Sequence, residues 1–421
     1  MSESDRMFKK SAEIFPSGVN SPVRYFSPHP VFIRRASGPH MFDEDGNTYI
    51  DYCLGFGPHI LGHSHPVVAE ALKEQADCAI SPGTANRYEQ ELGQMILEAT
   101  GEEMMRFTNS GTEATMHAIR LARGYTGRKF IVKMEGCYHG AHDYSLIKTG
   151  SGGITFGSPS SRGIPPEVAG TVIPVTFNDL NSVEDAFRNF GKNIAAVITE
   201  PVMGNAGVIL PEDGFLEGLR DICDRYSALL ILDEVITGFR FHYGNYQQLT
   251  GIRADITTYG KIIGGGLPVG ALASSKSIMR YLAPSGSVYE AGTFSGNPMT
   301  MAAGTAALNV LKHSNYSMLD TMSEEILGGI IRVLRNNGLN ATGNRIGGMF
   351  QFFFNTDAVT NYNSAIESNS EMYMKFFSCS LENGIYFAPG QFETNFLSFS
   401  HTAREIDDTL KRVEISAEKI A

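Results

Sequence analysis

The chain has 421 residues, more than one ordinary domain needs, and its hydrophobic content of 42% excludes a disordered protein. Its net charge of −11 argues against nucleic acid and anionic membranes as partners, although a site on an acidic protein can be basic enough for a small anionic substrate. Five scattered cysteines without a CxxC pair, a polar N-terminus and the lack of an apolar run of about 18 residues predict a cytoplasmic protein with no signal peptide and no membrane span.

Short apolar runs separated by helical patterns occupy residues 61–310. This alternation predicts an α/β domain in which helices flank a mainly parallel sheet. Helical periodicity is clear over Ala114–Ala122 and Phe215–Cys223. The predicted buried strands are Phe130–Val132, Val172–Val175, Ile194–Thr199, Ala228–Leu232 and Ile256–Tyr259.

Small polar residues precede the first of these helices, over Thr108–Glu113. A glycine and hydroxyl residues at a helix N-terminus form an anion site, because the free N–H groups and the helix dipole both favour phosphate. An ordinary N-cap made by Ser110 or Thr112 is the alternative. The chain has neither a GxxxxGK[ST] motif nor a GxGxxG motif that opens a helix, which weakens a nucleotide-binding interpretation.

Residues Thr149–Ala169 are rich in Gly, Ser and Pro and show no periodicity. A loop of this length inside a compact protein is usually functional or disordered. We interpret it as a lid over an active site, with a passive surface loop as the alternative.

Two predicted strands end in residues that carry chemistry. Ala228–Leu232 runs into Asp233 and Glu234, and ligands of open α/β sheets bind at the carboxyl ends of strands. Ile256–Tyr259 is followed by Gly260 and Lys261, and then by a glycine-rich stretch. A lysine in such apolar surroundings has a lowered pKa and a nucleophilic amine, although a surface lysine and a surface carboxylate remain alternatives for each residue alone.

The C-terminal part differs from the α/β pattern. Gly347–Phe354 is strand-like, and Thr402 and Glu405 have capping-box spacing ahead of a helical period. We predict that residues 1–60 and 311–421 together form a smaller α+β domain, beside a large domain over residues 61–310.

A phosphate cup, a carboxylate for a pyridine nitrogen and an amine for an aldehyde are the groups that pyridoxal phosphate requires. With these groups in this order, the chain resembles the class III aminotransferases of fold type I, and within them the glutamate-1-semialdehyde aminomutases. The similarity runs nearly end to end. Its motifs are FPSGVNSPVRYF (15–26), NSGTEATMHAIRLARGYTGR (109–128), EGCYHG (135–140), DEVITGFR (233–240), YGKIIGGGLPVGA (259–271), AGTFSGNP (291–298) and GIYFAPGQFE (384–393).

The resemblance implies a role for each matching residue. Lys261 would form the Schiff base and move a proton, and Asp233 would keep the ring nitrogen protonated. Ser110, Gly111 and Thr112 would bind the phosphate, Tyr138 and Val235 would pack on the two ring faces, and His139 and Asn205 would lie near the ring. Thr293 would reach the cofactor of a second subunit, which implies a homodimer with shared sites. Ser21, Arg24, Ser151 and Glu393 would bind the substrate, and Arg24 suits a planar carboxylate.

Some residues depart from the family pattern. The family has a tryptophan in the stretch that matches Gly55–Pro58, where this chain has Phe56, and it has serine where this chain has Gly390. Both changes fall on the substrate side. His63 and His65 resemble a metal pair, but the family has a similar stretch before a turn, so no metal site is expected.

The resemblance implies a reaction. Pyridoxamine phosphate would aminate the aldehyde of glutamate 1-semialdehyde to give bound 4,5-diaminovalerate, and removal of the original amino group would release 5-aminolevulinate for tetrapyrrole synthesis. A transient contact with glutamyl-tRNA reductase would deliver the aldehyde. The alternatives are an ω-aminotransferase that uses a separate amine donor and oxo acid, and a cofactor-binding protein that has lost catalysis, which Lys261 and Asp233 argue against.

Overall fold

The computed structural model describes residues 2–148, 158–355 and 357–421 of the chain. The chain folds into two compact units. The larger unit comprises Val67–Ser314 with Thr360–Tyr362, and the smaller comprises Met1–Pro66, Asn315–Val359 and Asn363–Ala421. The sequence placed the corresponding boundaries near residues 60 and 310. Within the described residues, no helix is long and apolar enough to cross a membrane.

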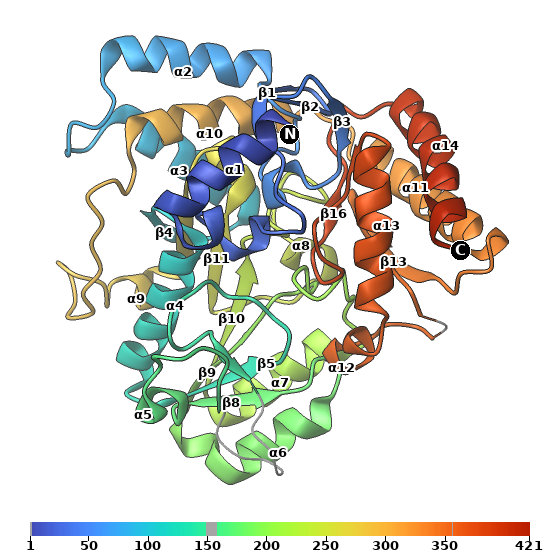
Figure 1. Cartoon of the computed structure of the whole chain (residues 1–421). Helices are drawn as coiled ribbons and strands as arrows, with labels where there is room; N and C mark the ends of the chain where they lie inside the picture. Colours follow the sequence, from blue (N-terminus) through green and yellow to red (C-terminus); the bar gives the residue numbers. More distant parts are fainter. Residues whose placement is uncertain (1, 149–157, 356) are drawn as a thin grey trace. The chain divides into compact units, whose positions relative to one another are not determined.

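A seven-stranded sheet with the order β4-β12-β11-β10-β9-β5-β8 forms the centre of the larger unit (Figure 1). Strands β11, β10, β9, β5 and β8 are parallel neighbours, and β12 runs antiparallel between β11 and β4. The strands are β4 (Met104–Thr108), β5 (Phe130–Met134), β8 (Val172–Val175), β9 (Ile194–Thr199), β10 (Leu229–Glu234), β11 (Ile256–Gly260) and β12 (Gly270–Ser274).

The mainly parallel sheet is confirmed, and each predicted strand forms at its predicted place to within two residues. The sequence did not predict β12, whose residues Gly270–Ser274 are glycine, alanine, leucine and serine. This composition lacks the β-branched and aromatic residues that mark a strand, and the strand forms because partners on both sides pair with it.

Helices of the larger unit flank the sheet (Figure 1). Helix α4 packs on β4 and on β9 to β12, and its small residues Ala118 and Ala122 are fully buried against the sheet. The helices are α2 (Pro66–Cys78), α3 (Arg87–Thr100), α4 (Gly111–Thr126), α5 (Pro166–Ala169), α6 (Leu180–Phe190), α7 (Phe215–Tyr226), α8 (Gln247–Thr250), α9 (Lys276–Met279) and α10 (Pro298–Leu311), with the 3₁₀ turns η4 (Gly191–Asn193) and η5 (Lys261–Gly264).

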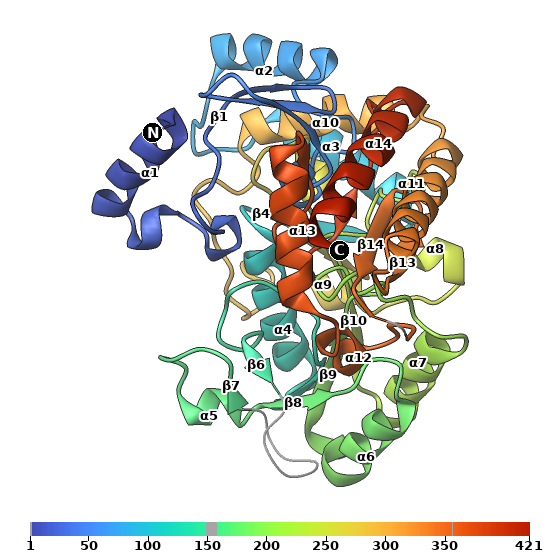
Figure 2. The ribbon, with the colours of Figure 1, turned by 45° about the vertical axis from the view of Figure 1, so that its right-hand side comes forward.

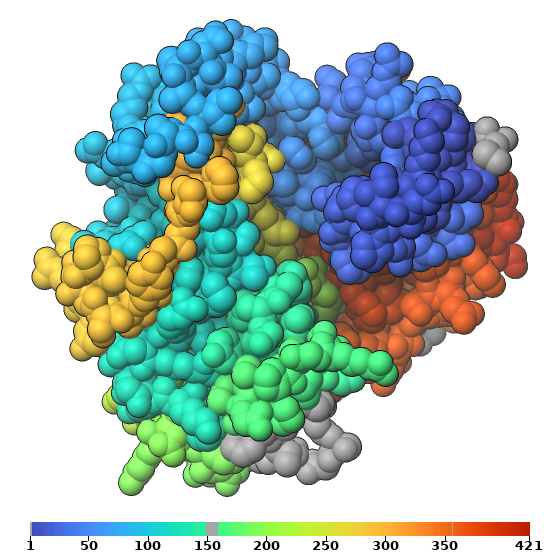
Figure 3. Space-filling model, turned by 60° about the vertical axis from the view of Figure 1, so that its left-hand side comes forward, coloured from blue at the N-terminus to red at the C-terminus, as the bar shows by residue number. Residues whose placement is uncertain are grey.

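The segment between α9 and α10 runs over the surface of the larger unit, where it is drawn in gold (Figure 3). Its aromatic residues Tyr289 and Phe294 are 71% and 59% exposed.

The predicted lid falls partly outside the described residues, which omit 149–157. Of the remainder, β7 (Ser158–Pro159) pairs with β6 (Ile147–Lys148), and Pro166–Ala169 forms the short helix α5. The end of the segment is therefore anchored to the larger unit, and Ile164 and Ala169 are buried there.

The smaller unit contains two sheets and several helices (Figure 2). One sheet has the order β1-β2-β3-β15 and the other β13-β14-β16. The strands are β1 (Ile33–Ser37), β2 (His40–Asp43), β3 (Thr48–Asp51), β13 (Thr342–Ile346), β14 (Met349–Phe353), β15 (Ile385–Tyr386) and β16 (Asn395–Phe396). The helices are α1 (Glu3–Ile14), α11 (Ser317–Asn336), α12 (Tyr362–Ile366), α13 (Ser370–Glu382) and α14 (Ala403–Ile420), with η1 (Pro16–Gly18), η2 (Pro22–Arg24) and η3 (Leu54–Phe56).

Two local predictions for this unit are confirmed. Thr402 caps α14 and forms a capping box with Glu405. The Thr402 side chain accepts a hydrogen bond from the backbone of the first helical turn, and the Glu405 side chain accepts one from the backbone N–H of Thr402. Strand β14 lies within Gly347–Phe354 and is buried along its length. Aromatic packing supports it, with the ring of Phe352 against Tyr373, Phe376 and Phe387.

Candidate active site

The N-terminus of α4 forms one wall of a cavity in the larger unit. Ser110 is the N-cap, and its hydroxyl accepts a hydrogen bond from Glu113 N at 3.1 Å. Two glycines let neighbouring backbone approach closely. A Cβ on Gly270 would lie 2.1 Å from Ser110 O, and one on Gly140 would lie 2.4 Å from Thr112 Oγ1. The cap satisfies Glu113 N, and the positive end of the helix dipole at Gly111 and Thr112, which line the cavity, favours an anion.

Asp233, at the end of β10, is only 3% exposed, and hydrogen bonds hold its side chain in one orientation. Its Oδ1 accepts hydrogen bonds from Thr258 Oγ1 at 2.9 Å and from Val235 N at 3.1 Å, and its Oδ2 lies 2.7 Å from His139 Nδ1. Burial lowers the pKa of His139, and the Asp233 carboxylate opposes that shift. Within the described residues, His139 Nε2 has no hydrogen-bond partner.

Lys261 directly follows β11 and has a left-handed backbone with φ of 47°. A non-glycine residue in this region costs about 1–3 kcal/mol and persists where the surrounding structure enforces it, often at functional sites. Val235 fills the space beside it. A Cβ on Gly260 would lie 3.1 Å from Val235 Cγ1, and one on Gly111 would lie 3.0 Å from the same atom.

These elements enclose a cavity of about 200 Å³. It brings together nine residues that the sequence predicted, from segments far apart in the chain: Ser110, Gly111, Thr112, Tyr138, His139, Asn205, Asp233, Val235 and Lys261. The other lining residues are Gly140, Glu200, Ile236 and Val269, which the sequence analysis missed. Glu200 could have been predicted in the same way as Asp233, because it directly follows a predicted strand, β9.

Glu200 is a second buried carboxyl group at this cavity. Oε1 accepts a hydrogen bond from Tyr138 N at 2.9 Å, and Oε2 accepts one from Gly204 N at 2.8 Å. Burial, together with the nearby charge of Asp233, raises the pKa of Glu200 to about 7. The cavity therefore contains one carboxyl group that titrates near neutrality.

The remaining predicted residues are not among the described residues that line this cavity. Thr293 lies on the exposed segment before α10, and Ser151 is outside the described residues. Ser21, Arg24 and Glu393 belong to the smaller unit. There, Arg24 and Phe56 line a separate cavity of about 360 Å³.

Of the two histidines that resemble a metal pair, His63 contacts a carboxylate. His63 Nε2 lies 2.7 Å from Asp51 Oδ2, and the buried Asp51 also accepts hydrogen bonds from Cys53 N and Leu54 N. No group of three or more His, Cys, Asp or Glu in the described part of the chain is arranged to hold a metal ion. His63 thus has a structural partner.

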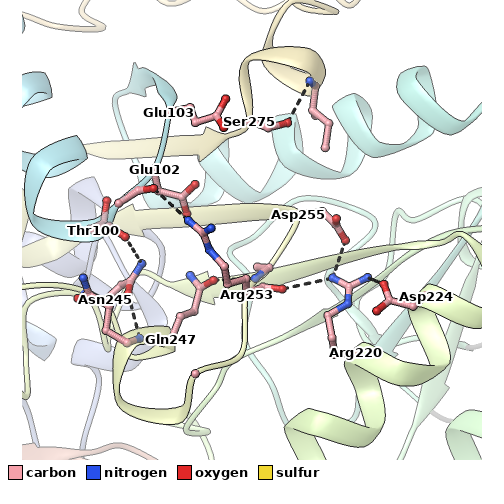
Figure 4. Close-up of a pocket in the computed structure, with 15 residues that line it drawn as sticks. Thr100, Glu102, Glu103, Arg220, Asp224, Asn245, Gln247, Arg253, Asp255 and Ser275 are labelled. Carbon is pink, nitrogen blue, oxygen red and sulfur yellow. Dashed lines mark hydrogen bonds and ion pairs between the residues drawn. The ribbon is translucent and has the colours of Figure 1, made fainter.

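A further cavity, of about 660 Å³, lies elsewhere in the larger unit and is lined by none of the predicted site residues (Figure 4). Arg220 points toward two carboxylates there, at 2.7 Å from Asp224 and 2.8 Å from Asp255. Glu102 and Glu103 also line it. The guanidinium charge of Arg220 is therefore balanced, and the excess of carboxylates disfavours a phosphate ligand.

Comparison with known proteins identifies the class to which this fold and cavity belong. The model of the class-III aminotransferase family matches residues 22–389, and the chain belongs to that family. Among its relatives, the chain is 55% identical to the glutamate-1-semialdehyde 2,1-aminomutase of Thermoplasma volcanium over 412 residues, which cover 98% of each chain. It is 51% identical to the aminomutase of the same name from Thermoplasma acidophilum, over 99% of each chain.

Solved structures show the same fold. An omega-transaminase from Sphaerobacter thermophilus superposes with a TM-score of 0.93 at 30% identity, over 100% of this chain and 98% of that one. A glutamate-1-semialdehyde-aminomutase from Pseudomonas aeruginosa PAO1 superposes with a TM-score of 0.89 at 24% identity, over 99% and 94%. The fold-type I architecture predicted from the sequence is confirmed.

Proposed function

We propose that this protein is a pyridoxal-phosphate- and pyridoxamine-phosphate-dependent aminomutase that converts glutamate 1-semialdehyde into 5-aminolevulinate. The observation that carries the proposal is the convergence of Lys261, Asp233 and the N-terminus of α4 on one cavity. The relatives named as aminomutases, which match the chain over nearly its whole length, support the choice of substrate.

The cavity residues fit the cofactor. The helix N-terminus at Ser110–Thr112 lines the cavity and suits a phosphate. Asp233 suits a protonated pyridine nitrogen, and Lys261 supplies an amine on the same cavity. When bound, the cofactor supplies an electron sink that stabilises negative charge on the carbon next to the transferred amino group.

The chain's own groups then have separate tasks. Lys261 accepts and returns a proton at Nζ, as general acid–base catalysis requires. The carboxyl group of Asp233 is held in one orientation by its hydrogen bonds and its contact with His139. Tyr138 and Val235 provide surfaces on which a flat ring can pack.

Substrate binding and assembly belong to the same proposal. Arg24 and Ser21 would bind the substrate carboxylate, and Ser151 and Glu393 would also contact the substrate. Thr293 would act on the site of a partner subunit in a homodimer, which agrees with its exposure and with that of its neighbour Phe294. A cytoplasmic location and a transient contact with glutamyl-tRNA reductase complete the proposal.

An ω-aminotransferase is the second candidate, since the structural match to an omega-transaminase has a TM-score of 0.93. Incubation with glutamate 1-semialdehyde alone separates the two. Many turnovers to 5-aminolevulinate without added amine donor or oxo acid support the aminomutase. Turnover only when both are added would instead establish the aminotransferase and direct attention to Phe56 and Gly390.

A further inference from the structure

Glu200 joins two loops that line the cofactor cavity. Its Oε1 accepts a hydrogen bond from Tyr138 N at 2.9 Å, and its Oε2 accepts one from Gly204 N at 2.8 Å. Glu200 is only 2% exposed. Asn205, the residue after Gly204, also lines the cavity and places its amide beside the same carboxyl group. A change in the charge of Glu200 therefore acts on Tyr138 and Asn205, which line the cavity.

Several charged and titratable groups face Glu200. Asp233 on β10 raises its pKa, and the amine of Lys133 and the thiol of Cys137 lie close enough for Glu200 to influence their pKa values. Lys133 Nζ donates to Met134 O at 3.2 Å, and among the described residues no ion pair joins it to Glu200. Two buried carboxylates so placed resist simultaneous ionisation, and Glu200 is the one with the raised pKa, of about 7.

The contact between Glu200 and Asn205 can form in two ways. Asn205 Nδ2 lies 3.4 Å from Oε1 and 3.3 Å from Oε2. The oxygen and nitrogen of a carboxamide have nearly the same shape, so a half-turn of the amide exchanges a donor for an acceptor at this position. An ionised carboxylate needs the donor, whereas a protonated carboxyl group needs an acceptor.

We propose that Glu200 and Asn205 form a proton-linked switch that changes the hydrogen-bonding character of the cofactor cavity. When Glu200 is ionised, it accepts from Asn205 Nδ2, and Oδ1 is the amide atom that meets the ligand. When Glu200 takes up a proton from solvent, its hydroxyl donates to Oδ1, and the NH₂ group meets the ligand. The cavity thus offers an acceptor at high pH and a donor at low pH.

The switch rests on the proposed function only in its choice of ligand, since the cofactor is the molecule expected in this cavity. The first test needs neither catalysis nor substrate. Infrared difference spectra of the full-length holoenzyme are recorded one pH unit below and one above 7, and again after removal of the cofactor. We expect a protonated-carboxyl band that disappears at the higher pH and is missing from Glu200→Gln.

Glu234→Gln is the matched control. Glu234 is equally buried and has a pKa raised to about 7, but it bonds to Tyr246 and Gln247 and does not line the cavity. Its replacement removes a band of its own and leaves the Glu200 band in place. Melting temperatures of both variants establish that they are folded.

The second test measures whether the protonation of Glu200 alters cofactor binding through Asn205. Dissociation constants of pyridoxal phosphate and pyridoxamine phosphate are determined over the same pH range for the wild type, Asn205→Ala and Glu234→Gln. We expect the ratio of the two constants to change at least about five-fold across the transition in the wild type and in Glu234→Gln, because a mismatched donor or acceptor is costly when buried. In Asn205→Ala the carboxyl band persists, but the ratio changes less across the transition than in the wild type.

Two results would overturn the switch. One is a Glu200 that shows no protonated band below pH 7, and the other is an Asn205→Ala variant whose ratio changes with pH as in the wild type. Neither outcome depends on turnover of glutamate 1-semialdehyde, so failure of the switch is distinct from failure of the proposed function.

Discussion

Asp233 shows how a single side chain is prepared for its task. Thr258, Val235 and His139 bind its two oxygens, so its charge is oriented before a ligand arrives. Such preorganisation avoids the cost of reorienting dipoles during a reaction. Lys261 contributes differently, since its left-handed backbone follows the last residue of β11 and is enforced by the surrounding fold.

Asp233→Asn tests the charge at this position. The amide keeps the shape but loses the negative charge, so we expect turnover to fall by at least about a hundredfold, with little change in melting temperature. Asp224→Asn is the control, because Asp224 is paired with Arg220 and lies at the other cavity. Steady-state kinetics of both variants provide the comparison, and equal losses in the two would contradict the role of Asp233.

Glu234→Gln tests the effect of burial on stability. Burial raises the pKa of Glu234 from 4.5 to about 7. The folded protein therefore keeps this group neutral where the unfolded chain ionises it. Its stabilising contribution is complete below pH 4.5 and is lost as the pH rises through about 7. We expect the melting temperature of the variant to depend less on pH over this range, whereas parallel curves for variant and wild type would refute the assignment.

The sequence could predict Ser110–Thr112, Asp233 and Lys261 because they lie at a helix start and at strand ends. The family resemblance added Tyr138, His139, Asn205 and Val235. Glu200 was missed, although that residue follows β9 in the same way as Asp233 follows the core of β10. None of the motifs that carry the family resemblance includes Glu200, yet its position at a strand end was sufficient physical reason to predict it at the site.

At the scale of the elements, continuous apolar runs predicted the five parallel strands, and capping-box spacing predicted the start of α14. Strand β12 could not be predicted, because its small residues acquire strand structure only through pairing with β4 and β11. Residues whose roles depend on a partner subunit likewise carry no local signal.

Helix α11 provides a direct test of packing at this scale, since it contains two successive glycines. A Cβ on Gly328 would meet nothing within 4 Å, whereas one on Gly329 would lie 2.5 Å from Leu410 Cδ2 of α14. We expect Gly328→Ala to stabilise the protein by about 0.5–1 kcal/mol. Gly329→Ala should destabilise it by about 1–3 kcal/mol through overpacking.

Denaturant unfolding of the two alanine variants measures both effects. They differ by one position in the same helix, so helix propensity contributes equally to each. Equal changes in unfolding free energy would show that α14 does not pack on α11 at Gly329.

On the scale of the whole molecule, the chain forms two compact units, and the cavity lined by Asp233 and Lys261 lies in the larger one. The exposed segment before α10 carries Thr293, Phe294 and Tyr289 and is the surface we assign to a partner subunit. We expect sedimentation to give twice the chain mass of 45.9 kDa.

Subunit mixing tests whether Thr293 acts on the partner's site. Lys261→Ala and a Thr293 variant, each inactive alone, are unfolded, mixed in equal amounts and refolded together. If Thr293 acts across the interface, each mixed dimer has one intact site, and about a quarter of wild-type activity returns. If Thr293 acts within its own chain, no site is intact and no activity returns.

The most direct test of the central claim is chemical labelling of the cofactor site. The holoenzyme is reduced with borohydride, digested and analysed by mass spectrometry, with Lys276→Ala as a control for an exposed lysine. The account predicts that the cofactor's mass is found on the peptide that contains Lys261, and that the Lys261→Ala variant carries none. Labelling of a different lysine, or no labelling of the wild type, would contradict it.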